Sequence, residues 1–139
     1  MEEIVEFEYL EENTVNSHVM FNRKTGEVKI EDFNDDPLCT FMGYNEHTIP
    51  NIMRFLQERC FPETRADRDV LLELLGLRVY NPLDIVRKTH GRMVGDFFWI
   101  RFKGENLIWE DFPPREASDE TKLHWNRGMY EDYQKGLIK

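Results

Sequence analysis

The chain has 139 residues, of which 40% are hydrophobic, 13% are aromatic and 32% are charged, and its formal net charge is −9. This composition is typical of a folded domain with a well-solvated exterior. No apolar run approaches the roughly 20 residues that span a bilayer, and the acidic N-terminus lacks the basic start of a signal peptide. We therefore expect a soluble, cytoplasmic protein with no membrane association.

The acidic residues are concentrated toward the two ends of the chain. Residues 1–36 contain eleven acids and three bases, residues 37–103 contain eight and ten, and residues 104–139 contain eight and five. A chain with this balance is poorly suited to holding phosphate backbones, so we expect no direct binding to nucleic acid. The acidity can keep the protein soluble, meet a basic protein surface, or mimic nucleic acid toward a protein that binds it.

The first part of the chain alternates between apolar and polar positions, which is the period of a strand with one face in water. Val5, Phe7 and Tyr9 show this alternation first. Residues 17–21 repeat it, and residues 28–30 resume it after a turn-rich stretch. The pattern predicts a hairpin.

From residue 48 the apolar positions change to helical spacing. Thr48 can cap a first helix that ends before Pro62. The apolar stripe of this helix is Ile49, Ile52, Met53, Leu56 and Cys60. This spacing predicts a helix with one face against a core.

Two further helices are predicted before residue 92. Thr64 and Asp67 resemble a weak capping box that opens the second helix, with Gly76 just past its end. The expected buried stripe of the second helix is Val70, Leu71, Leu74 and Leu75. Asn81 followed by proline caps the third helix, which ends at Gly91.

The remaining sequence predicts a second hairpin and a last helix. Residues 96–102 form an aromatic run, residues 103–106 form a turn, and residues 107–112 pair with the preceding run. After two prolines, Ser118 can cap an amphipathic helix in which Trp125, Met129 and Tyr133 lie four residues apart. Gly128 stands inside this helix at a cost of roughly 1 kcal/mol relative to alanine.

The order of these elements predicts an α+β fold. We expect a small antiparallel sheet made from two hairpins, with three short central helices packed on it and a C-terminal amphipathic helix. We assign residues 1–112 to a single α+β domain and residues 113–139 to a C-terminal helical extension.

No complete catalytic or metal-binding motif is present in the sequence. Cys60 lies on a helical apolar stripe, which disfavours a catalytic pair with His90, and no GxSxG elbow surrounds a serine. The four histidines do not form HxxxH or HExxH pairs, and no phosphate-binding glycine loop is visible. Cys39 and Cys60 fit ordinary buried thiols. We expect a protein that is not an enzyme and holds neither a cofactor nor a metal.

Recognition features are more numerous, and we regard eight residues as candidates for binding a partner. They are Arg59, Arg65, Arg87, Lys88, His90, Arg92, Trp99 and Trp109. The cations after the third helix either stabilise its dipole or grip a carboxylate or phosphate through bidentate bonds. His90 is either a hydrogen-bonded turn residue or a base. The two tryptophans lie either in the core or at an interface.

Residues 52–100 resemble the N-terminal subdomain of HipA-type serine/threonine kinases. The resemblance rests on a helix that runs from Leu56 into a loop containing Pro62, and on the Arg65–Leu75 helix. It also rests on the residues Pro82-Leu83-Asp84 and on the glycine-flanked loop before Phe97. The β segments that precede residue 52 fit the small N-terminal sheet of that family in order. The tail after residue 112 has no counterpart in the family.

The resemblance implies a function without catalysis, because these 139 residues do not contain the ATP site, metal-binding aspartate or catalytic loop of the kinase. Some related systems encode the subdomain as a separate, HipS-like small protein, which restrains a truncated kinase as an antitoxin. We therefore expect an interaction module that binds and modulates a HipA-like kinase in a bacterial toxin–antitoxin system. The alternative is an acidic phage-type inhibitor that blocks a nucleic-acid-binding host defence protein by charge mimicry.

Overall fold

The structure is a computed structural model that describes residues 3–93, 96–114 and 116–139. The chain divides into two compact units, Met1–Glu105 and Asn106–Lys139. Residues 106–112, which we assigned to the first domain, group with the C-terminal unit. Within the described ranges, no helix is long and apolar enough to cross a lipid bilayer.

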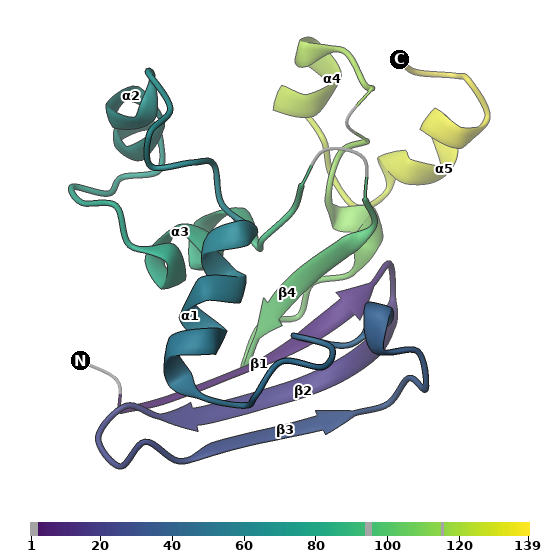
Figure 1. Cartoon of the computed structure of the whole chain (residues 1–139). Coiled ribbons are helices and arrows are strands. Elements are labelled where there is room, and N and C mark those ends of the chain that lie inside the picture. The colour runs from purple at the N-terminus through teal and green to yellow at the C-terminus, as the bar shows by residue number, and fades with distance from the viewer. Residues whose placement is uncertain (1–2, 94–95, 115) are drawn as a thin grey trace. The chain divides into compact units, whose positions relative to one another are not determined.

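The first unit is built on a four-stranded antiparallel sheet (Figure 1). Its strands are β1 (Ile4–Glu11), β2 (Thr14–Asn22), β3 (Val28–Asp32) and β4 (Phe98–Phe102). They lie in the order β3-β2-β1-β4, so the first three form a meander and β4 returns to the far side of β1. The mixture of this sheet with several helices confirms the predicted α+β class.

The two faces of the sheet follow the alternation in the sequence. Val5, Phe7 and Tyr9 on β1 and Val19 and Phe21 on β2 are at most 4% exposed and belong to the hydrophobic core. The glutamates between the β1 core residues lie on the opposite face, because successive side chains of a strand point to opposite sides. The antiparallel pairing of β1 with β2, and of β2 with β3, confirms the predicted hairpin.

The predicted second hairpin does not form. Among the described residues, 107–112 contain no strand, and Trp109–Asp111 is the short 3-10 helix η2. Instead β4 pairs with β1, which places Phe102 opposite Phe7 and Ile100 opposite Tyr9. The physical reason is the core: Tyr9 stacks on Phe98 with ring centroids 5.2 Å apart, so β1 offers β4 an aromatic partner inside the protein.

Two helices cover the core face of the sheet (Figure 1). In α1 (Ile49–Glu58), the Thr48 hydroxyl accepts a hydrogen bond from the Asn51 amide. In α3 (Pro82–Thr89), the side chain of Asn81 accepts one from the amide of Asp84. Both predicted caps are therefore confirmed. The buried residues that the two helices contribute are Ile52, Leu56, Leu83, Ile85 and Val86.

The helix between them, α2 (Arg68–Leu74), differs from the prediction. It begins four residues after Thr64, and it buries Leu72 at 4% exposure. Of the predicted buried stripe, Val70 is 59% exposed and Leu74 is 78% exposed, so the prediction was wrong for these two. Leu71 and Leu75 are half-buried, and Leu75 packs against the core. The side of the helix that meets the core is therefore set by Leu72, together with Leu75 and Leu77 just past the helix end. Gly76 follows the helix with a φ of +76°, as predicted for a residue just past a helix end.

The C-terminal unit contains two short helices where one was predicted. They are α4 (Asp119–Leu123), capped by the Ser118 hydroxyl as expected, and α5 (Met129–Gln134). The break between the two helices falls at residues 124–128, and Gly128 directly precedes α5. The side chain of Asn126 accepts a hydrogen bond from the amide of Gly128. A local side-chain acceptor competes with the helical bond there, and glycine adds its conformational entropy.

Candidate functional site

Arg59 is a structural link between α1 and β4. Its guanidinium donates two hydrogen bonds to the carboxylate of Asp96 at 2.7 and 3.0 Å. It donates two more to the carbonyls of Gly91 and Phe98 at 2.8 and 2.9 Å. The Arg59 side chain is 10% exposed. Four of the five N–H donors of the guanidinium are thus engaged within the first unit, which makes Arg59 a link between elements in this structure.

His90 is the residue that ends α3. It adopts a left-handed backbone conformation with φ of +59°, and its amide donates to the carbonyl of Val86 at 2.7 Å. Its ring Nε2 lies 2.9 Å from Glu105, and the His90 side chain is 15% exposed. The structure therefore favours the hydrogen-bonded turn residue over a base. Gly91, which we expected to end the helix, follows with a φ of +65°.

The other predicted cations differ in their surroundings. Arg87 lies over the ring of Phe102 at 4.5 Å, in a cation–π contact. Lys88 is exposed near the end of α3, and Arg92 is half-buried. Arg65 is exposed and pairs with Asp67 at 2.6 Å. Arg65 and Arg87, two of the cations predicted to bind a partner, therefore make contacts within the first unit.

The two predicted tryptophans lie in different units and differ in burial. Trp99 is completely buried, and its indole N–H donates to the carbonyl of Glu12 at 2.6 Å. Trp109 lies half-buried in η2 of the C-terminal unit. Of the candidate residues in the first unit, Trp99 lies in β4, and Arg59, Arg87 and His90 contact residues of that strand.

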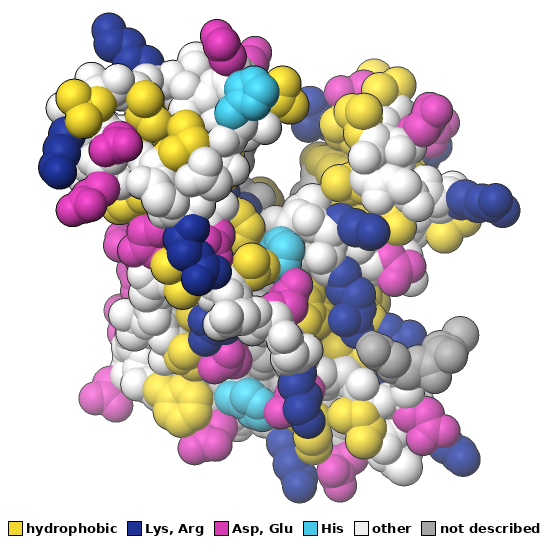
Figure 2. All heavy atoms as spheres, turned by 180° about the vertical axis from the view of Figure 1, so that it is seen from behind, with side chains coloured by type: hydrophobic (Ala, Val, Ile, Leu, Met, Phe, Trp, Pro, Cys, Tyr) yellow, Lys and Arg dark blue, Asp and Glu magenta, His cyan; other side chains and the backbone are white. Residues whose placement is uncertain are grey.

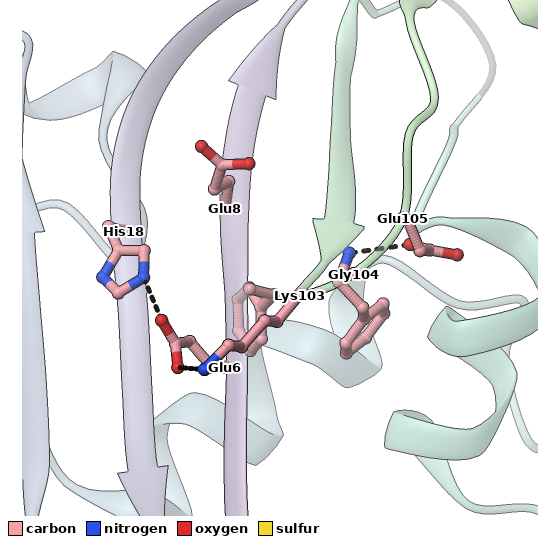
Figure 3. Close-up of a pocket in the computed structure, with 8 residues that line it drawn as sticks. Glu6, Glu8, His18, Lys103, Gly104 and Glu105 are labelled. Carbon is pink, nitrogen blue, oxygen red and sulfur yellow. Dashed lines mark hydrogen bonds and ion pairs between the residues drawn. The ribbon is translucent and has the colours of Figure 1, made fainter.

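The face of the sheet opposite the core carries a shallow hollow of about 260 Å³ (Figure 3). In it Glu6 lies between His18, whose Nε2 is 2.8 Å away, and Lys103, whose Nζ is 3.4 Å away. The hydrogen bond with His18 lowers the pKa of Glu6. Arg101 pairs with Glu8 at 2.9 Å on the same face. The charges are mutually satisfied, which suits a solvated sheet face better than a ligand site.

A larger groove of about 640 Å³ lies beside the C-terminal end of α1. Its lining includes Arg54, Cys60, Thr64, Tyr80 and Met93. Burial raises the pKa of the Cys60 thiol to about 12, so this thiol is not an activated nucleophile. Within the described residues, no group of three histidine, cysteine or acidic side chains is placed to hold a metal ion.

The feature that the sequence interpretation missed is the apolar surface of α2. Val70 and Leu74 are one helical turn apart and therefore share a face, and Val79 in the following loop is 67% exposed. Figure 2 shows hydrophobic side chains gathered on the surface of the first unit, and the α2 region is among them. We call Val70, Leu74 and Val79 the α2 patch. The sequence signal for this patch was the predicted apolar stripe of the second helix, which contains more aliphatic residues than the seven-residue α2 buries.

Comparisons with known proteins returned no match: no family model, no curated protein and no solved structure is similar to this chain at the threshold applied.

Proposed function

We propose that the protein is a non-catalytic interaction module that binds a HipA-like kinase and restrains it as an antitoxin. The proposal starts from the resemblance of residues 52–100 to the N-terminal subdomain of those kinases. In the structure this segment belongs to one compact unit, in which Arg59 joins the end of α1 to the loop before β4. A unit of this kind can keep its fold apart from a kinase body.

The observation that carries the proposal is the α2 patch. Three aliphatic side chains are each more than half exposed on a short helix and the loop after it. Leaving such side chains in water forgoes roughly 1.5–3 kcal/mol each compared with full burial. A partner surface that covers them would recover part of that free energy. Interfaces generally place apolar anchors at their centre and charged residues at their rim.

The test is co-purification with a HipA-like kinase, sought first among the products of the neighbouring genes, followed by a titration to obtain the dissociation constant. Replacing Leu74, the most exposed member of the α2 patch, by aspartate puts a charge into the patch and is expected to weaken binding at least about tenfold. The matched control is Leu38→Asp, because Leu38 is 85% exposed in the same unit but lies in η1 (Pro37–Cys39). Equal loss in both variants, or no binding by the wild type, would contradict the proposal.

Salt dependence separates this function from acidic mimicry. Docking through the α2 patch is expected to change little between low and high salt, because apolar burial is not screened. A mimic of nucleic acid would instead lose affinity steeply as salt rises and would tolerate Leu74→Asp. The second pattern would favour the acidic-inhibitor alternative.

A further inference from the structure

The two edge strands of the sheet, β4 and β3, differ in whether their outward backbone groups form hydrogen bonds. On either side of β4, the carbonyl of Phe97 accepts from the amide of Glu12, and the amide of Lys103 donates to the carbonyl of Glu6. In this register the amides of Phe98, Ile100 and Phe102 point away from β1. Each of these outward amides donates a hydrogen bond to a group of the first unit. They donate to Asp96 at 3.2 Å, to the His90 carbonyl at 2.7 Å and to Glu105 at 2.7 Å.

Two of the three outward carbonyls of β4, those of Phe98 and Phe102, are covered as well. Arg59 donates to the carbonyl of Phe98, and the amide of Glu105 donates to that of Phe102. An exposed strand edge is a template for pairing with another chain, and proteins commonly block such edges. The β4 edge is blocked.

The β3 edge has no such cover. At the two ends of the strand, the carbonyl of Glu27 accepts from the amide of Asn22 and the amide of Phe33 donates to the carbonyl of Asn16. This register directs the amides and carbonyls of Val28, Ile30 and Asp32 away from the sheet. No side chain or loop of the described residues donates to or accepts from these outward groups. In Figure 1, β3 is the outermost strand of the sheet, with no other element of the first unit along its outer side.

The geometry points to pairing of β3 with β3 of a second copy of this chain, antiparallel about a twofold axis at Ile30. In this register Ile30 faces Ile30 of the other copy, and Val28 faces Asp32. All three outward residues can then exchange backbone hydrogen bonds, and the two sheets become one sheet of eight strands. The inference concerns self-association and does not depend on the proposed kinase partner.

The side chains of Lys29 and Glu31 select both the partner and the register. They are exposed on the sheet face opposite the core, and the Ile30-centred register places Lys29 of each copy directly opposite Glu31 of the other. Shifting by one step in either direction keeps the backbone bonds but places Lys29 against Lys29, or Glu31 against Glu31. Directly opposed like charges destabilise a sheet, whereas opposite charges stabilise it. Charge complementarity therefore favours one self-complementary arrangement.

The test is sedimentation equilibrium of the full chain over a range of concentrations. The wild type is expected to dimerise reversibly. Lys29→Glu and Glu31→Lys are each expected to raise the dimer dissociation constant at least about tenfold, because both attractive pairs become repulsive. Lys24→Glu is the matched control: Lys24 is an exposed cation in the turn between β2 and β3, outside the paired segment, and this variant should dimerise normally.

Charge exchange makes the test specific. The double variant Lys29→Glu/Glu31→Lys should recover the wild-type affinity, and a mixture of the two single variants should form a heterodimer. Ile30→Pro, which removes an outward amide without touching the bonds to β2, should be monomeric while keeping the circular dichroism spectrum of the folded chain. A wild type that stays monomeric at the highest concentration would overturn the inference. A dimer that is indifferent to both single variants would overturn it as well.

Discussion

Arg59 offers the sharpest test of how the first unit is held together. Arg59→Met keeps most of the aliphatic volume of the side chain but removes every donor of the guanidinium. The change leaves the Asp96 carboxylate and the carbonyls of Gly91 and Phe98 without the hydrogen bonds they accept at 2.7 to 3.0 Å. Breaking a buried ion pair by removing one partner costs roughly 3–5 kcal/mol.

Water around the Asp96 carboxylate reduces the expected loss of stability. The Asp96 side chain is 33% exposed, whereas that of Arg59 is 10% exposed, so solvent can satisfy part of the abandoned carboxylate. We therefore expect Arg59→Met to lower the free energy of unfolding by about 2–4 kcal/mol, less than the full cost of a buried pair.

Urea unfolding monitored by tryptophan fluorescence measures this loss, because Trp99 lies in β4 beside the Arg59 contacts. The matched control is Arg54→Met on the same helix: Arg54 is exposed, and a change of less than about 0.5 kcal/mol is expected there. A double-mutant cycle with Asp96→Asn should give a clear coupling energy. A loss below about 1 kcal/mol for Arg59→Met would refute the view that this network joins α1 to β4.

Three further predictions concern burial and charge in the first unit. Leu72→Ala should lower the free energy of unfolding by about 2–4 kcal/mol and Leu74→Ala by less than about 0.5, as measured by urea titration; the opposite order would restore the originally predicted stripe. Because the pKa of Glu6 is lowered in the folded state, its contribution to stability is present above its ordinary value of 4.5 and is lost as pH falls through the lowered value. Glu6→Gln should therefore flatten the acid side of a plot of melting temperature against pH, and an unchanged slope would contradict the role of the His18 contact. In a Cys39→Ser variant, which removes the half-buried second thiol, Cys60 should react with a thiol reagent at neutral pH only after denaturant is added, and rapid labelling of that native variant would contradict its burial.

The features that sequence reasoning predicted correctly are local ones. The alternation of Val5, Phe7 and Tyr9 depends only on the period of a strand, and it identified the core face of β1. The caps at Thr48, Asn81 and Ser118 depend on one side chain and an amide three residues later. These signals lie within a few residues of each other, so the sequence contains all the information needed to interpret them.

The features that it misplaced depend on contacts between distant residues. The sequence placed a partner for β4 next to it in the chain, but the aromatic side chains of β1 compete for β4 from about ninety positions away. The candidate site changed for the same reason. In the sequence, Arg59 belongs to a stretch that contains several cations. Only folding brings Asp96 within hydrogen-bonding distance of it.

The sequence by itself determined the α+β class, the alternation of the first strands, and the capped starts of α1, α3 and α4. Tertiary structure decided which strand flanks β1, which side of α2 meets the core, and which edge of the sheet stays open. The division has one physical cause. Backbone periods and caps are stabilised by neighbours in the chain, whereas pairing, helix rotation and edge protection are stabilised by whichever distant groups the collapsed chain brings within hydrogen-bonding or van der Waals distance.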